Sequence, residues 1–105
     1  MSKDDLEIAK KLRRELKKQF NKIDVMVYGS RARGDSEPDS DLDVCVIVDN
    51  FNKTTRDKVF TIAWELSLEE GVVITPLIFG QKEWQNSPII ESPIYKNIQR
   101  EGIKV

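Results

Sequence analysis

The chain has 105 residues, a formal net charge of −1 and 33% charged residues. This length and composition predict one globular domain over residues 1–105 and exclude a low-complexity disordered chain. The net charge counts against a general nucleic-acid binder, and the absence of histidine excludes Ser-His triads and histidine-ligated zinc, so carboxylates must carry any catalysis. No apolar run approaches the roughly 18 residues of a membrane span and the N-terminus has no signal-peptide core, so we expect a cytoplasmic protein.

The chain opens with a pattern typical of an amphipathic helix. From Asp4 to Phe20, apolar residues recur every three or four positions between Lys, Arg and Glu. These basic residues alternate with acids, so we interpret them as a solvated helix face rather than as a nucleic-acid patch. The next segment, Ile23–Tyr28, has β-branched residues and predicts a short strand that ends in the turn Gly29-Ser30.

A polar loop and a second strand follow. Arg31–Ser40 is rich in Gly, Asp, Ser and Pro, which predicts a loop, with a short helical turn at its start as an option. Asp41–Val48 begins with two acids and continues as an almost unbroken apolar run, typical of a central strand buried on both faces. Cys45 lies in this run, so we expect a small buried side chain rather than a nucleophile.

The second half of the chain begins with the longest predicted helix. Asn52–Glu70 has apolar residues at helical spacing, and Gly71 stands where a helix stop belongs. Trp64 adjoins the apolar face of this helix, and Trp84 follows later. Either indole can stack on a nucleobase, but their spacing beside other apolar residues favours a place in the core for both.

A third strand and a helical tail complete the pattern. Val72–Phe79 predicts the strand, and Pro76 indicates that it lies at a sheet edge or is bulged, because proline cannot donate to a ladder. The tail Gln81–Val105 predicts two short helices, one around Trp84 and one from Ile94 to Glu101.

Two carboxylates stand at the start of the second predicted strand. Because alternate side chains of a strand share a face, Asp41 and Asp43 are expected to point the same way, with backbones ~7 Å apart at ~3.3 Å per residue. Without a cation such neighbours repel, whereas a divalent ion between them keeps both ionised. Hard oxygen ligands suit Mg²⁺, which fills the rest of its shell with water and substrate phosphate. The pair therefore predicts a site for Mg²⁺ and a nucleoside triphosphate.

The turn before these acids supplies groups for phosphate. Gly29 lets the backbone approach a phosphate closely, and Ser30 adds a hydroxyl. Arg31 and Arg33 follow, and either guanidinium can bind phosphate oxygens; we favour Arg33. We also count Ser40 among the nucleotide-binding residues. Each feature alone is common, but their combination predicts phosphoryl or nucleotidyl transfer, which needs alignment and charge neutralisation rather than a covalent nucleophile.

The segment from Gly29 to Val44, G-S-R-A-R-G-D-S-E-P-D-S-D-L-D-V, resembles the signature of the DNA polymerase beta-type nucleotidyltransferase superfamily. In size and element order the chain is similar to the minimal nucleotidyltransferases, and its ending from Ile98, I-Q-R-E-G-I-K-V, is similar to theirs. The resemblance implies an α+β fold in the order α-β-α-β-α-β, with a three-stranded mixed sheet flanked by helices.

The same resemblance implies an activity and its residues. Gly29 and Ser30 are implied to bind nucleotide phosphate, and Asp41 and Asp43 are implied to bind Mg²⁺. The implied reaction is Mg²⁺-dependent transfer of a nucleoside monophosphate, with AMP from ATP as the favoured case, to a hydroxyl of a protein or a small molecule.

One feature departs from the family pattern. Active members usually carry a third carboxylate in the third strand, whereas V-V-I-T-P-L-I-F has none. A catalytically impaired, nucleotide-binding interaction subunit is therefore the alternative to an enzyme. Minimal nucleotidyltransferases are often encoded beside a small helical HEPN-type partner, to which they act as antitoxins by adenylylating or binding it. A HEPN-type partner or a homo-oligomer is thus expected.

Overall fold

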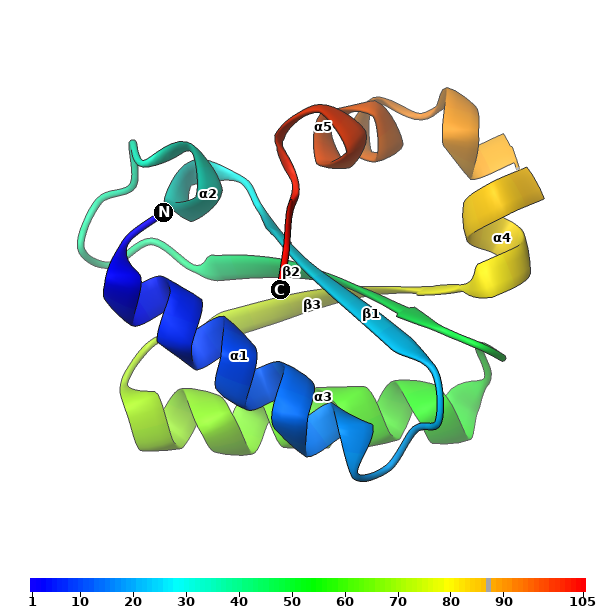
Figure 1. Cartoon of the computed structure of the whole chain (residues 1–105), viewed down its shortest axis with the longest axis horizontal. Coiled ribbons are helices and arrows are strands. Elements are labelled where there is room, and N and C mark those ends of the chain that lie inside the picture. Colours follow the sequence, from blue (N-terminus) through cyan, green and yellow to red (C-terminus); the bar gives the residue numbers. More distant parts are fainter. Residues whose placement is uncertain (87) are drawn as a thin grey trace.

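The computed structural model describes residues 1–86 and 88–105, and Ser87, in the predicted tail, lies outside the described residues. The first six elements follow the predicted order α-β-α-β-α-β (Figure 1). In chain order the elements are α1 (Lys3–Lys17), β1 (Ile23–Tyr28), α2 (Ser30–Arg33), β2 (Leu42–Val48), α3 (Lys53–Glu70), β3 (Ile74–Gly80), α4 (Gln81–Asn86), the 3-10 helix η1 (Pro88–Glu91), α5 (Pro93–Glu101) and β4 (Ile103–Lys104).

The strands form one mixed sheet in the order β3-β2-β1-β4. Strand β2 is central, as predicted; it pairs antiparallel with β1 and parallel with β3. The expected count of three strands was wrong, because β4 pairs antiparallel with Met26 and Val27 of β1. A two-residue strand is too short to show an alternating pattern in the sequence. Pro76 lies in the edge strand β3, which confirms the prediction drawn from it.

Helices cover both faces of the sheet, and the side-chain alternation of β2 separates two cores. Leu42 and Val44 pack with α1 and α3, whereas Cys45 packs on the opposite face with Trp84 of α4 and Ile98 of α5. Figure 1 shows α1 and α3 on one side of the strands and α4 and α5 on the other. Cys45 is buried, as expected. Among the described residues, no helix has the length and apolar character to cross a membrane.

The ends of the long helices have local causes. The Ser2 hydroxyl accepts a hydrogen bond from the amide of Asp5 at the start of α1. Asn52 and Thr55 form a reciprocal capping box at the start of α3, and Gly71 ends this helix with φ at 72°. The predicted helix limits were therefore correct to within a few residues.

The prediction that both tryptophans are buried holds for one of them. Trp84 is buried and packs against Phe79 and Tyr95 in tilted arrangements, with ring centroids 5.2 Å and 4.6 Å away. Trp64 was predicted wrongly, because 64% of it is exposed. Helix α3 buries a narrow stripe that includes Ala63, and Trp64 lies next to this stripe rather than in it. Helical spacing alone does not say how wide a stripe the sheet covers.

Candidate active site

The Gly29 turn lies against Asp43. Strand β1 ends at Tyr28, which is the antiparallel partner of Asp43 in β2. Gly29 follows with φ at 77° and ψ at −160°, a conformation open essentially to glycine alone. A Cβ atom at this position would lie 2.5 Å from Asp43 Oδ2, too close for any side chain. Glycine is thus required here both by the backbone and by the neighbouring carboxylate.

Asp41 and Asp43 flank Leu42 at the start of β2. Leu42, between them, is fully buried against α1 and α3, so Asp43, the next residue of the strand, points to the opposite face. Asp43 is partly buried, and Asp41, one residue before β2, is exposed. That the two carboxylates converge on one cation stays a prediction.

Residue 75 faces Asp43 from the third strand. Thr75 is its partner in the parallel β2–β3 ladder, and Thr75 Oγ1 donates a 2.6 Å hydrogen bond to Asp43 Oδ1. This ladder position therefore carries a hydroxyl rather than a carboxylate. The nearest acids in the sequence lie elsewhere: Glu70 forms an ion pair with α1, and Glu83 lies beside Gly80 at the other end of β3.

Arg31 is committed to the structure of the loop. Its Nη1 donates to Asp5 Oδ1 at 2.8 Å, and both side chains are nearly buried. Its Nε and Nη2 donate to the carbonyl oxygen of Ser40 at 2.8 Å and 2.6 Å. Arg31 thus joins α1 to the segment just before Asp41, which leaves Arg33 as the candidate for phosphate.

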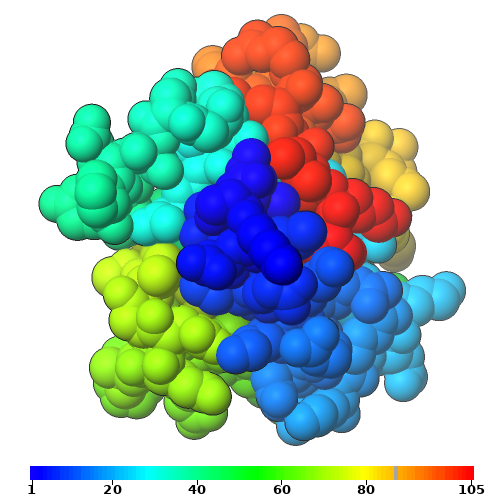
Figure 2. All heavy atoms as spheres, turned by 60° about the vertical axis from the view of Figure 1, so that its left-hand side comes forward, coloured from blue at the N-terminus to red at the C-terminus, as the bar shows by residue number. Residues whose placement is uncertain are grey.

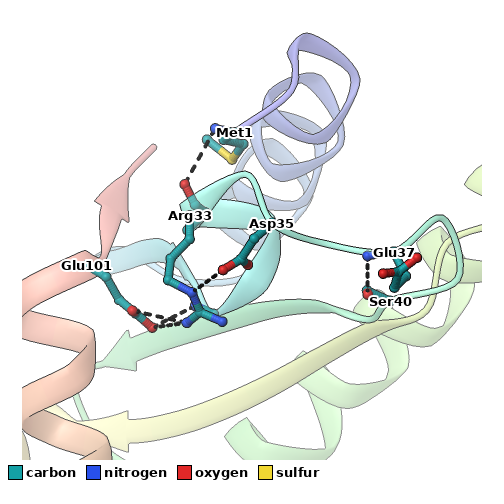
Figure 3. Close-up of polar contacts among 8 residues, drawn as sticks. Met1, Arg33, Asp35, Glu37, Ser40 and Glu101 are labelled. Carbon is teal, nitrogen blue, oxygen red and sulfur yellow. Dashed lines mark hydrogen bonds and ion pairs between the residues drawn. The ribbon is translucent and has the colours of Figure 1, made fainter.

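Arg33 is held by two carboxylates (Figure 3). Its Nε donates to Asp35 Oδ2, and its Nη1 donates to both carboxylate oxygens of Glu101, all at 3.1 Å. The hydrogen bonds with Asp35 and Glu101 raise the pKa of Arg33, so it remains charged. Its Nη2 has no hydrogen-bond partner among the described residues. This nitrogen is free to meet an anion while the rest of the guanidinium is fixed.

Glu101 is a site residue that the sequence did not reveal. Besides binding Arg33, its Oε1 accepts a 3.1 Å hydrogen bond from the amide of Gly29. Glu101 ends α5 and is 72 residues from the turn that it contacts. The only signal was its place in the I-Q-R-E-G-I-K-V ending, whose resemblance to the family named no role for it.

The two serines of the predicted site differ in their contacts. The Ser30 hydroxyl has no hydrogen-bond partner within the described chain, and the first amides of α2 have no preceding helical carbonyl to bind. The Ser40 hydroxyl instead accepts a 3.0 Å hydrogen bond from the amide of Glu37 (Figure 3). Ser30 is therefore available to a ligand, whereas Ser40 shapes the loop that leads to Asp41.

The donor set suits a hard divalent cation. No cluster of three or more Asp, Glu or Cys that could hold a metal occurs in residues 1–86 and 88–105. Mg²⁺ commonly takes one or two protein carboxylates and completes its shell with water and phosphate, so Asp41 and Asp43 fit this ion. Burial, with the charge of Asp43, raises the pKa of Tyr28 to about 12. This phenol therefore stays neutral and adds no charge to the site.

A family model of the nucleotidyltransferase domain matches residues 9–105. The chain belongs to the nucleotidyltransferase domain family. This membership classes it with the transferase enzymes and agrees with the resemblance found in the segment from Gly29 to Val44.

Individual relatives of this nucleotidyltransferase domain support the family and the fold. A protein of Methanocaldococcus jannaschii, provisionally named protein adenylyltransferase MJ0141, is 32% identical over 103 residues, which are 95% of this chain and 97% of that protein. A crystal structure of a toxin-antitoxin with AMP-PNP superimposes with a TM-score of 0.65 over 93% of this chain and 69% of that chain. The identity to that structure is 15%, so it shows the α+β fold alone.

Proposed function

We propose that this nucleotidyltransferase domain transfers AMP from Mg²⁺-bound ATP to a hydroxyl group of a protein. The observation that carries the proposal is the contact between the Gly29 turn and Asp43, which brings a phosphate-binding turn to a cation-binding carboxylate. The M. jannaschii relative of nearly equal length, with its provisional name of protein adenylyltransferase, supports the choice of group and acceptor.

The chain's own groups have distinct roles in the proposed reaction. The Ser30 hydroxyl and the first amides of α2 bind phosphate oxygens, and Arg33 Nη2 offsets the negative charge of the departing pyrophosphate. The acceptor oxygen forms a bond to the α-phosphorus as the bond from that phosphorus to the bridging oxygen breaks. Pyrophosphate leaves, and the proton of the acceptor hydroxyl passes to solvent water.

Asp41 and Asp43 would hold the cation in this scheme. Their two carboxylates provide hard oxygen ligands on one face of the sheet. When bound, Mg²⁺ neutralises triphosphate charge and helps to align the α-phosphate. Thr75 orients one oxygen of Asp43 through its hydrogen bond, which leaves Oδ2 turned toward the Gly29 turn.

The proposed setting is a toxin-antitoxin pair. The superimposed structure is a toxin-antitoxin with AMP-PNP, which supports both an adenine nucleotide and a protein partner for this fold. We propose a small helical partner of the HEPN type as the acceptor.

A second candidate is an interaction subunit that binds nucleotide without transferring it. Thr75 favours this alternative, because the position paired with Asp43 has no negative charge to activate an acceptor hydroxyl. In that function the domain would inhibit its partner by covering it.

Calorimetric titration of ATP in the presence of Mg²⁺ tests the nucleotide site. Asp41→Asn and Asp43→Asn should each weaken binding at least about tenfold, because each removes a cation ligand. Asp39→Asn is the matched control, since it makes the same charge change at an exposed position of the same loop. Equal losses in all three variants would mean that only the net charge of the loop matters.

Incubation with α-labelled ATP and the purified product of the neighbouring gene separates the two candidate functions. Transfer of label to that protein supports the enzyme. Formation of a stable complex without transfer supports the interaction subunit. Absence of both contradicts the proposed toxin-antitoxin setting.

A further inference from the structure

Helix α3 carries an apolar ridge that the rest of the chain leaves uncovered. Phe60, Trp64 and Leu68 follow one another at four-residue spacing, and Trp64 and Leu68 are 64% and 66% exposed. Val73, just before β3, is 58% exposed. The ridge and the start of β3 line a groove of about 480 Å³. Adjacent exposed side chains of this size are typical of a docking surface rather than of scattered surface apolar residues.

The edge of the sheet beside the groove is closed to strand addition. The amide of Ile74 points away from β2 and donates to Ser67 Oγ at 2.9 Å. By alternation along β3, the backbone nitrogen of residue 76 also points away from β2. This residue is Pro76, which has no N–H to donate to an added strand. An added strand would therefore find these two outward positions without a donor. The groove instead suits an occupant that inserts side chains.

The length of the ridge matches a short helical segment. From residue 60 to residue 68 a helix rises about 12 Å at ~1.5 Å per residue, which is about two turns. A partner helix with large apolar side chains at i and i+4 can fill a groove of this length.

The β3 side of the groove adjoins the candidate active site. Thr75 and Pro76 belong to its lining, and Thr75 also donates to Asp43. Because β3 lies between the groove and β2, an occupant beside β3 lies about two strand spacings, ~9.6 Å, from the strand that bears Asp43. Figure 2 shows the junction of α3 and β3 (yellow-green) directly below the projecting loop that follows α2.

A positive charge lies beside Phe60, the first residue of the ridge. The guanidinium of Arg56 lies 4.9 Å from the centroid of the Phe60 ring. Its ion pair with Asp57, at 3.4 Å, is exposed, and such pairs contribute little. Arg56 is therefore available to a carboxylate of a partner beside Phe60.

We propose that the groove docks an amphipathic helix of the acceptor protein. Its apolar face covers Trp64 and Leu68, and an acidic residue meets Arg56. The hydroxyl that receives AMP reaches past Thr75 and around the edge strand β3 to Asp43, which points to the face of the sheet opposite α3. The inference rests on the proposed function, because it assigns a binding surface to the protein acceptor of that reaction.

The test measures transfer from α-labelled ATP to the soluble proteins of the source organism. Trp64→Ser and Leu68→Ser should each reduce labelling about tenfold, since truncating a central apolar anchor commonly has an effect of this size. Phe51→Ser is the matched control, because Phe51 is 44% exposed and lies beside Gly80, at the opposite end of β3. Calorimetry with Mg²⁺ and ATP should give unchanged affinity in all three variants, which also shows that they fold.

Each outcome of this test decides between the inferences. Loss of labelling only in the Trp64 and Leu68 variants supports the docking groove. Equal labelling by every variant overturns the groove and leaves the proposed function intact. Absence of labelling by the unmodified chain overturns the protein acceptor and the groove together. Sedimentation that shows a dimer dissolved by Trp64→Ser assigns the groove to a second copy and overturns the acceptor as its occupant.

Discussion

Thr75 and Asp43 are partners in the β2–β3 ladder, and the Thr75 hydroxyl donates a 2.6 Å hydrogen bond to Asp43 Oδ1. The contact fixes one oxygen of the candidate cation ligand without adding negative charge. The residue at position 75 therefore sets how many carboxylates the site contains.

Replacing Thr75 with Asp should convert the site into one with three carboxylates. We expect Mg²⁺ affinity to rise by about tenfold, because the ion offsets the repulsion between Asp43 and the new acid. Without a divalent cation the same variant should melt at a lower temperature than the unmodified chain. Thr75→Asn is the control of equal shape, and thermal melts across a Mg²⁺ series provide the measurement. A similar response of the Asp and Asn variants to Mg²⁺ would place residue 75 outside the cation site.

Gly29→Ala should damage both stability and nucleotide binding. Its Cβ would collide with Asp43 Oδ2, and the backbone conformation at this position is open essentially to glycine alone. Gly34→Ala is the control, since Gly34 also has a positive φ, at 85°, but has no atom within 4 Å of an added Cβ. We expect Gly34→Ala to cost about 1 kcal/mol of unfolding free energy and Gly29→Ala about 3 kcal/mol. Urea denaturation and calorimetry with ATP measure the two effects, and equal costs at both positions would contradict the predicted collision.

Glu101→Ala should weaken binding of ATP although this residue is an acid. Its carboxylate holds both the Gly29 amide and Arg33, so its loss leaves the turn and the guanidinium less ordered. We expect about a fivefold loss of affinity, corresponding to about 1 kcal/mol for a hydrogen bond of this kind. Glu101→Gln keeps an acceptor for Gly29 and should retain more affinity than the alanine variant. Tighter binding by Glu101→Ala would mean that this carboxylate competes with phosphate.

The buried thiol of Cys45 predicts a loss of stability in alkali. Burial raises the pKa of Cys45 from 9.0 to about 12, so the folded chain retains this proton at a pH where the unfolded chain releases it. The resulting stabilisation is complete below pH 9 and is lost as the pH rises to about 12. Cys45→Ala should therefore show a shallower fall of unfolding free energy over this interval. Urea denaturation at several pH values measures the slope, and equal slopes in both proteins would contradict the expectation. The thiol should also resist Ellman's reagent until the chain unfolds.

The sequence by itself determined the features that depend on local spacing. Alternation along one strand predicted that Leu42 points into the core and that Asp43 points away from it, and Leu42 is buried in the core. The helical spacing of apolar residues predicted the long helices, and the glycine after α3 predicted where that helix ends. Pro76 predicted the edge position of β3. Each of these features follows from the geometry of a single strand, helix or turn, which a run of neighbouring residues is enough to specify.

Only the tertiary structure decided which distant residues meet. The parallel register brings Thr75 to Asp43, and the packing of α5 brings Glu101 to the Gly29 turn, although no local pattern encodes either contact. The same holds for Trp64, whose exposure depends on how α3 is rotated against the sheet. A sequence period gives the direction of a side chain relative to its own element, whereas its neighbours are set by the register and packing between elements.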